Sequence, residues 1–258
     1  MVAVLTRLLE RLPRGGAGAD AAARVPAQLR PVAWTAAAIL LGYPDERQRE
    51  RLGLVRAALA EAGLHSAAGG LSRPAGGLGH SRPGGSDGSD ILDLVDELAA
   101  RDLAALQAEY VQEFDLSRRH SLHLSYWTDG DTRRRGEAIG RFKEAYRAHG
   151  AEFDETELPD YLPMVLEFAA RISPEDGAEL LQAYRASLEL LRLALERDHL
   201  VWAPAVALVC ATLPGASPAT EAEAMALAGA TGPQTETVGL DPYPTGLLPL
   251  RSIDHGEK

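Results

Sequence analysis

The chain has 258 residues, a formal net charge of −11, and a composition that is 46% hydrophobic and 24% charged. This composition excludes full-length disorder and leaves enough apolar residues for a sizeable core. The acidic balance argues against a nucleic-acid binder, because such proteins carry basic patches that neutralise phosphates. It favours a soluble protein or one with a basic partner.

The ratio of leucine and alanine to β-branched residues predicts the fold class. The chain contains 39 Leu and 44 Ala, against only 12 Val and 5 Ile. Leu and Ala are good helix formers, whereas Val and Ile favour sheets. We therefore expect an all-α protein.

The single cysteine and the apolar runs bear on the compartment. Cys210 excludes an intramolecular disulfide, and its apolar neighbours indicate a buried hydrophobe rather than a reactive thiol. The longest apolar run, residues 200–213, is too short to span a bilayer. Residues 1–12 make a poor signal peptide. The expected location is the cytoplasm, without stable membrane association.

The first predicted elements form a helical pair followed by a break. Apolar residues recur at helical spacing over 29–40 and 46–62, and Gly42 and Pro44 separate the two stretches. Residues 65–90 are rich in Gly, Ser and Pro and lack periodicity, which predicts a disordered insertion within one domain.

The second half continues with helices. Asp90 is a candidate cap for a stripe that runs from Ile91 to Phe114, after which residues 115–130 break the pattern. Further helices are predicted in this order: one capped by Asp131 or Thr132 and ending at Gly150, one over 161–172, one from Pro174 to Leu195, and one over 200–213. Residues 1–27 are expected to be flexible and 28–213 to form one helical domain. The tail, 214–258, is expected to be largely mobile, with a short helix near 219–229.

Searches for catalytic motifs fail, and histidines offer the only metal pattern. His120 and His123 lie three residues apart, which can place both on one helical face as metal ligands, with Asp115 or Asp129 as further ligands. The simpler interpretation is that they are ordinary polar groups beside an irregular segment.

Charge is unevenly distributed along the chain. Residues 152–167 contain six acids and no Lys or Arg, whereas residues 131–147 contain six basic residues against three acids. These neighbours can pair with each other and complement helix dipoles. Alternatively, the acids can line a surface that accepts a basic or amphipathic helical peptide. Both interpretations stay open.

Three segments carry a resemblance to a known family. These are YVQEFDLSRRHSLHLSYWTDGDTRRRGEAIGRFKEAY at 110–146, ELPDYLPMVLEFAA at 157–170 and LLGYP at 40–44. Together they resemble the nitrate reductase molybdenum cofactor assembly chaperones (NarJ/NarW), within the TorD-like redox-enzyme maturation chaperones. Trp127 and Thr128 depart from the pattern of some members, and Ile139 stands where Met is common.

The resemblance implies a single-domain, all-α helical bundle of the TorD-like type, with no catalysis and no cofactor of its own. It also implies a cytoplasmic chaperone for the immature catalytic subunit of respiratory nitrate reductase, with the basic N-terminal segment of that subunit as the expected ligand. The chaperone would keep this client competent for molybdenum cofactor insertion before membrane docking.

The candidate partner-binding residues combine the two motif segments with the acidic run. They are Tyr110, Phe114, Asp115, Ser121, Leu122, His123, Leu124, Asp131, Arg133, Arg135, Gly136, Glu157, Leu158, Pro159, Asp160, Leu162, Pro163 and Glu167. The acids are expected to meet positive charge, and the leucines to offer apolar contact.

Three alternatives remain at this point. The client could be another molybdoenzyme, of the dimethyl sulfoxide reductase or formate dehydrogenase type. The protein could be a metal-dependent helical enzyme centred on Asp115, His120 and His123. Finally, Arg133 to Arg135 could bind the phosphates of the guanine dinucleotide cofactor directly.

Overall fold

The computed structural model describes residues 24–65, 90–130, 133–151 and 157–228. All regular elements in these residues are helices, and the extended backbone is limited to one isolated antiparallel bridge between His123 and Tyr161. The all-α fold class is therefore confirmed. The predicted flexible segments at 1–27 and 65–90, and the tail beyond 228, lie mostly outside the described residues.

The N-terminal helices are η1 (Ala27–Leu29), α2 (Arg30–Leu40), α3 (Glu46–Glu61), α4 (Ile91–Ala100) and α5 (Leu103–Tyr110). Three of them, α3, α4 and α5, begin at an aspartate cap. Asp45 accepts a hydrogen bond of 2.7 Å from the backbone N–H of Gln48, and Asp90 accepts one of 2.8 Å from Leu92. Asp102 does the same for Ala105 and splits the predicted stripe into α4 and α5.

Residues 111–130, predicted only as a break, contain three short helical pieces. A π-helix, η2 (Val111–Asp115), continues α5, and a 3-10 turn, η3 (Arg118–His120), and a short helix, α6 (Leu124–Asp129), follow. Single π-helical turns within helices are frequent at functional sites.

The C-terminal helices differ from the prediction at one point. They are α7 (Arg133–Ala148), α8 (Leu162–Arg171), α9 (Pro174–Ala183), α10 (Arg185–Arg197), α11 (Ala203–Ala211) and α12 (Glu221–Leu227). The predicted single helix from Pro174 to Leu195 is wrong, because the chain turns at Tyr184 (φ −104°, ψ 24°). The Tyr184 ring stacks on Phe142 at 4.9 Å, so packing against α7 overrides the continuous period.

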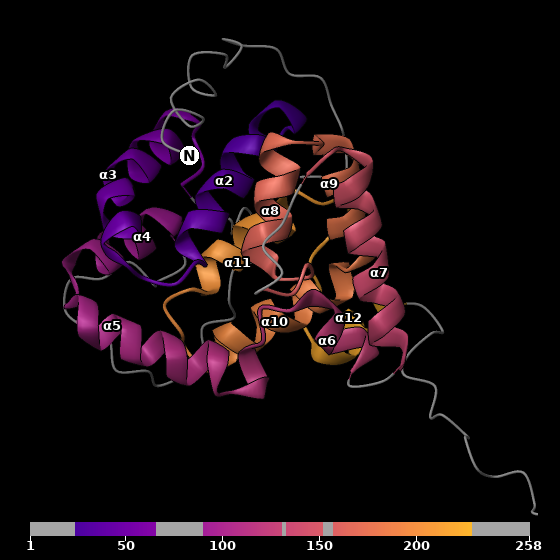
Figure 1. Ribbon diagram of the computed structural model, residues 1–258. Coiled ribbons are helices and arrows are strands. Elements are labelled where there is room, and N and C mark those ends of the chain that lie inside the picture. Colours follow the sequence, from indigo (N-terminus) through magenta and orange to yellow (C-terminus); the bar gives the residue numbers. More distant parts are fainter. Residues whose placement is uncertain (1–23, 66–89, 131–132, 152–156, 229–258) are drawn as a thin grey trace, which may run out of the picture.

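Helix α2 lies at the centre of the molecule, between α8, α11 and α3 (Figure 1). Residues 32–40 are buried throughout, which explains a helix apolar on nearly every side. Within the core, Trp34 donates to the Thr212 hydroxyl at 2.9 Å. Cys210 is buried, as predicted, and burial raises the pKa of its thiol. No helix of the described residues is both long and apolar enough to cross a membrane.

Close contact between α8 and α9 depends on a glycine. A Cβ added at Gly177 would lie 2.3 Å from Ala169, far inside van der Waals contact. Gly177 therefore lets the two helices cross closely, and it sets the position of α8, which carries one of the motif segments.

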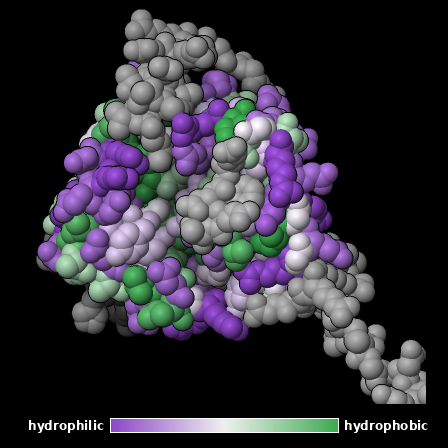
Figure 2. All heavy atoms as spheres, in the orientation of Figure 1, coloured by the Kyte–Doolittle hydropathy of each residue, from purple (hydrophilic) through white to green (hydrophobic). Residues whose placement is uncertain are grey.

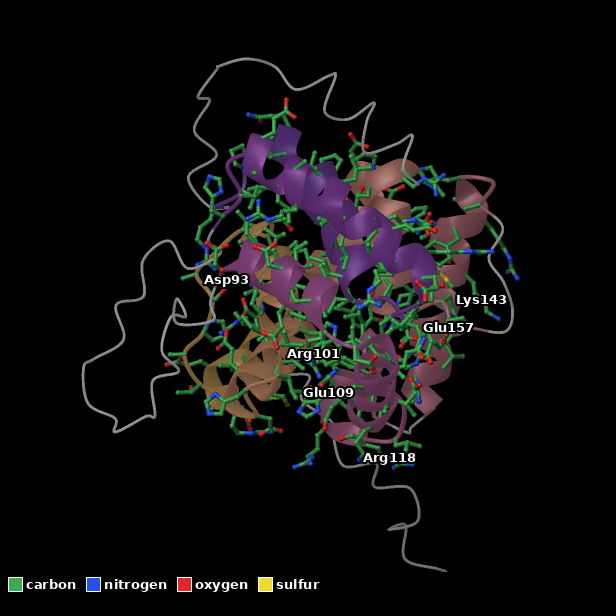
Figure 3. All side chains as sticks on the ribbon, turned by 90° about the vertical axis from the view of Figure 1, so that its left-hand side faces the viewer. Asp93, Arg101, Glu109, Arg118, Lys143 and Glu157 are labelled. Carbon is green, nitrogen blue, oxygen red and sulfur yellow. The ribbon has the colours of Figure 1, made fainter. Side chains whose placement is uncertain are left out.

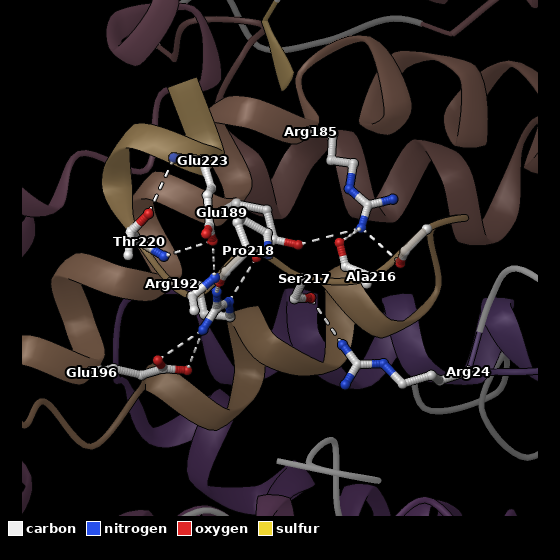
Figure 4. A network of polar contacts seen from close by, with 12 residues as sticks. Arg24, Arg185, Glu189, Arg192, Glu196, Ala216, Ser217, Pro218, Thr220 and Glu223 are labelled. Atoms are coloured by element: carbon white, nitrogen blue, oxygen red, sulfur yellow. Dashed lines mark hydrogen bonds and ion pairs between the residues drawn. The ribbon is translucent and has the colours of Figure 1, made fainter. Parts of the chain in front are cut away.

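A charged network on α10 fastens the segment that follows α11 (Figure 4). We call Arg185, Glu189, Arg192 and Glu196 the α10 ladder. Arg192 donates to Glu189 at 2.7 Å and to both carboxylate oxygens of Glu196 at 2.9 and 2.8 Å.

The arginines of the ladder also donate to backbone carbonyls of the following segment. Arg185 reaches the carbonyls of Gly215 and Ala216 at 2.8 and 3.0 Å, and Arg192 reaches that of Pro218 at 2.6 Å. The short helix predicted near 219–229 is confirmed as α12, which begins with a capping box between Thr220 and Glu223.

Candidate functional site

The two motif segments meet through their backbones. The N–H of Leu124 donates to the carbonyl of Asp160 at 3.1 Å, and the N–H of Leu162 donates to that of Leu122 at 2.8 Å. These bonds form the bridge between His123 and Tyr161. We call residues 121–125 and 157–162 the motif junction, since segments 32 or more residues apart in the sequence are joined there.

Asp160 holds the motif junction from inside. Its carboxylate is fully buried and accepts hydrogen bonds from the backbone N–H and hydroxyl of Ser125, at 3.1 and 2.6 Å. His123 Nδ1 lies 3.3 Å away and donates, because an ionised carboxylate can only accept. Burial opposes ionisation of Asp160, but the hydrogen bonds from His123 and Ser125 outweigh it and hold its pKa below the ordinary value.

A pair of tyrosines extends the junction toward α2. The hydroxyls of Tyr110 and Tyr161 lie 3.0 Å apart, and Tyr110 also donates to the carbonyl of Leu41 at 2.9 Å. Burial raises the pKa of Tyr161 to about 12, and the negative charges of Glu157 and Asp115 act in the same direction. Burial and the neighbouring Tyr161 are the main causes that raise the pKa of Tyr110, and the same two carboxylates raise it further. Both acids therefore act on the tyrosine pair.

The predicted acids fall into two groups. Asp115 is exposed, and Glu157 is half-buried, with 44% of its side chain exposed and His123 Nε2 lying 3.9 Å from its carboxylate. Within the described residues neither forms an ion pair with Lys or Arg. By contrast, Asp160 is buried, and Glu167 pairs with Arg171 one turn further along α8. Among the candidate acids that the structure describes, Asp115 and Glu157 are therefore the ones left open to direct contact with a cationic partner.

Most of the predicted apolar contacts lie inside the core. Seven candidates are buried: Tyr110, Phe114, Leu122, Leu124, Pro159, Leu162 and Pro163. They can shape a binding surface only from beneath, in this conformation. Leu158 differs, because it is 42% exposed.

The remaining candidates surround the junction. The backbone carbonyl of Ser121 accepts a hydrogen bond of 2.9 Å from the indole N–H of Trp127. The guanidinium of Arg135 lies over the Tyr126 ring, 6.0 Å from its centroid, and Gly136 is exposed on α7. Asp131 and the side chain of Arg133 lie outside the described residues.

The two histidines of the metal hypothesis face different partners. His120 is fully buried, with Nε2 2.8 Å from Asp198 and Nδ1 3.0 Å from Glu113. The Arg197 guanidinium lowers the pKa of Asp198 to about 2, and the hydrogen bond from His120 acts in the same direction. His123 points instead to Asp160. Across the described ranges, no three His, Cys, Asp or Glu side chains are placed to share a metal ion.

Two tyrosines belong to the site although they are missing from the predicted set. Tyr161 lies between predicted neighbours in the sequence, and Tyr43 belongs to the LLGYP segment at the end of α2. Tyr43 is 48% exposed, and its ring meets Tyr110 edge-on at 5.6 Å. Both could have been included from the sequence, because each is an aromatic residue within a motif segment already identified.

We call Tyr43, Asp115, Glu157 and Leu158 the acid–tyrosine surface; it lies around the buried Tyr110. The side view in Figure 3 shows Glu157 at the edge of the face that carries the Arg101–Glu109 pair. The face drawn in Figure 2 is largely hydrophilic, with separate hydrophobic patches. An exposed large apolar side chain therefore indicates a binding surface where it lies next to acids that have no Lys or Arg partner among the described residues.

Comparison with known proteins shows which families and proteins this chain is similar to. The family described as the nitrate reductase delta subunit matches residues 86–207, which include both motif segments. The Bacillus subtilis NarJ protein, named a probable nitrate reductase molybdenum cofactor assembly chaperone, is 27% identical over 184 residues, covering 71% of this chain and 89% of its own length. The Escherichia coli NarJ chaperone is 34% identical over 101 residues, covering 39% of this chain and 43% of its own.

Over these residues the chain is similar to the NarJ/NarW chaperones. Its similarity also extends to the nitrate reductase-like protein NarX of Mycobacterium tuberculosis, at 38% identity over 182 residues and 70% of this chain. The chain spans only about a quarter of the length of NarX (24%).

A solved structure supports the fold of the family. An Archaeoglobus fulgidus protein described as a redox enzyme maturation protein superposes with a TM-score of 0.50, covering 78% of this chain and 97% of its own. At 20% sequence identity, this likeness shows the fold alone.

Proposed function

We propose that this protein is a system-specific chaperone that binds the immature catalytic subunit of a nitrate reductase. It keeps that subunit competent for insertion of the molybdenum cofactor and performs no catalysis itself. The observation that carries this proposal is the family match over residues 86–207, which covers the whole motif junction. The proposed chaperone domain spans residues 28–213, and its work takes place in the cytoplasm before the client docks at the membrane.

The geometry favours a basic segment of the client as the ligand, with the N-terminal segment of the catalytic subunit as the expected one. Asp115 and Glu157 carry negative charge beside exposed apolar surface and have no Lys or Arg partner among the described residues. An amphipathic helix that presents basic and apolar side chains complements this arrangement. The buried candidates act by fixing the surface, not by touching the ligand.

Co-expression with the nitrate reductase catalytic subunit tests the client. The full chain carries an affinity tag, and co-purifying proteins are identified by mass spectrometry. We expect the catalytic subunit without its cofactor to be recovered. Recovery of a dimethyl sulfoxide reductase or formate dehydrogenase subunit in its place would assign the chaperone to another molybdoenzyme.

Calorimetry with a synthetic peptide of the N-terminal segment tests the mode of binding. We expect affinity to fall as salt rises, because exposed charges are screened within about 8 Å at physiological ionic strength. Binding that is insensitive to salt would contradict the electrostatic part of the proposal. Absence of binding would remove the N-terminal segment as the ligand.

A further inference from the structure

Tyr110 is a buried hub that joins three exposed groups. On one side its ring contacts Tyr43 edge-on, and on another it packs against Phe114 at 4.7 Å, next to Asp115 in the chain. Its hydroxyl lies 3.0 Å from that of Tyr161. The Tyr110 side chain thus contacts the turn after α2, the π-helix η2 and the residue before α8.

The Tyr161 side of this hub carries the second acid. The backbone N–H of Tyr161 donates to the carbonyl of Leu158 at 3.0 Å, which fixes the turn that starts at Leu158, directly after Glu157. Leu158 and Glu157 are both exposed by more than 40%. The hub therefore places an aromatic ring, an apolar side chain and two carboxylates around one region of the surface.

The Tyr43 ring is held in place and not free to collapse. Gln107 of α5 donates to the carbonyl of the next residue, Pro44, at 2.9 Å, and the ring edge rests on Tyr110 at an interplanar angle of 88°. Nearly half of Tyr43 nevertheless remains exposed. A fixed, exposed aromatic face attracts a cation without the cost of ordering the ring first.

Exposed acids in the described residues differ in their pairing, since some form ion pairs and others, such as Glu179, have no Lys or Arg partner there. Asp96 pairs with Arg56 at 2.7 Å, and Glu221 pairs with Arg197 at 2.7 Å. Among the described residues Asp115 has no such partner, and the Glu157 carboxylate has His123 Nε2 at 3.9 Å and accepts a hydrogen bond from the backbone N–H of Leu158 at 3.1 Å. These two acids differ from other unpaired acids in lying around the Tyr110 hub, where a cationic group would complement them.

We propose that Tyr43, Asp115 and Glu157 bind one arginine or lysine side chain of the client segment. Leu158 contacts the apolar residue beside it. The inference rests on the proposed function and deepens it, because it assigns the affinity to one basic position instead of to general charge. It also gives Tyr43 a role in specificity.

A probe that does not depend on the client tests the site itself. Acetyl-arginine amide is titrated into the full chain while the Tyr43 ring resonances are followed by NMR, with acetyl-norleucine amide as the uncharged control. We expect saturable shifts with arginine only, and at least a fivefold weaker response in the Asp115→Asn/Glu157→Gln variant. Equal shifts with both amides, or none at Tyr43, would overturn the inference even if the client segment binds elsewhere.

A peptide series then tests the single basic position. Each Arg or Lys of the client's N-terminal segment is replaced in turn by Gln, and affinities are measured for wild type, Tyr43→Leu and Tyr43→Phe. We expect Tyr43→Leu to weaken binding two- to fivefold and Tyr43→Phe, which keeps the ring, to leave it unchanged. At one peptide position, replacement by Gln should weaken binding to the wild type but should not weaken binding to Tyr43→Leu.

The outcomes separate this inference from the proposed function. Equal losses at every basic position, unchanged by Tyr43→Leu, would leave the chaperone role standing and remove the cation site. Glu179→Gln, which neutralises an exposed acid on α9, is the matched control and should change nothing. Failure of the unmodified segment to bind, with the arginine amide still bound, would contradict the proposed ligand alone.

Discussion

The α10 ladder and the acid–tyrosine surface both concentrate charge, but they resolve it in opposite ways. In the ladder, two arginines face two glutamates, and one further guanidinium nitrogen of each arginine reaches backbone carbonyls of the following segment. At the acid–tyrosine surface, two carboxylates stand near an exposed ring without a Lys or Arg partner among the described residues. Charge that is balanced internally stabilises the fold, whereas unbalanced charge is available to a partner.

The motif junction combines both behaviours. Its inner side is satisfied, since Asp160 is fully buried and accepts three hydrogen bonds. Its outer side, at Glu157 and Leu158, is exposed. The contrast predicts that substitutions on the inner side change stability and that substitutions on the outer side change binding.

The largest effect is expected inside the ladder. Glu189 is fully buried between Arg192 at 2.7 Å and Arg185 at 3.6 Å, so Glu189→Ala leaves buried positive charge uncompensated. We expect the free energy of unfolding in urea to fall by about 3–5 kcal/mol. Glu196→Ala, at a carboxylate that is 45% exposed, should cost about 0.2–1 kcal/mol. Equal losses would contradict the distinction between the two positions.

A smaller loss is expected at the junction. In Asp160→Asn the side chain cannot accept all three hydrogen bonds, and its amide group faces the N–H of Ser125. We expect a loss of about 1–3 kcal/mol. Hydrogen exchange should accelerate at Leu124 and Leu162, whose N–H groups cross the junction. Unchanged exchange at these two amides would show that Asp160 does not hold the segments together.

The pKa of Asp160 gives this contribution a pH dependence. Because the pKa is lower in the folded chain than in the unfolded one, the stabilisation is complete above about pH 4 and is lost as pH falls below that. Asp198, with a pKa of about 2, acts in the same direction. Thermal unfolding between pH 5 and pH 2, followed by circular dichroism, should show a shallower decline in Asp160→Asn. An identical decline of stability with pH in wild type and Asp160→Asn would show that the Asp160 carboxylate is not its cause.

The smallest effect concerns α12, which the ladder fastens to the core. Thr220→Ala removes the hydroxyl that caps the helix, and we expect a local loss of about 1 kcal/mol. Hydrogen exchange should accelerate at residues 223–227, while α2 and α8 remain protected. Acceleration across all three helices would show that α12 unfolds only together with the core.

The sequence was sufficient for the fold class and for most helices. Helical periodicity and the cap at Asp90 located helix starts, because these depend on nearby residues. The turn at Tyr184 was missed because its cause is stacking on Phe142, 42 residues earlier. Periodicity cannot detect such a contact.

The predicted site illustrates a second limit. Motif position could not separate buried Asp160 from exposed Glu157, since both lie in the same acidic run. Nor could it place Tyr43 beside Tyr110, because that contact depends on the packing of the turn after α2 against α5. Exposure and pairing, which only the structure supplies, distinguish positions that shape the surface from positions that can touch a partner.

One pair of measurements on a single variant tests the central claim most directly. In Asp115→Asn/Glu157→Gln, we measure the free energy of unfolding in urea and the affinity for the N-terminal segment of the nitrate reductase catalytic subunit. The account predicts stability within about 0.5 kcal/mol of wild type and affinity about tenfold weaker, with a flatter dependence on salt. Lost stability with unchanged affinity would contradict it, because the two carboxylates would then serve the fold and not the partner.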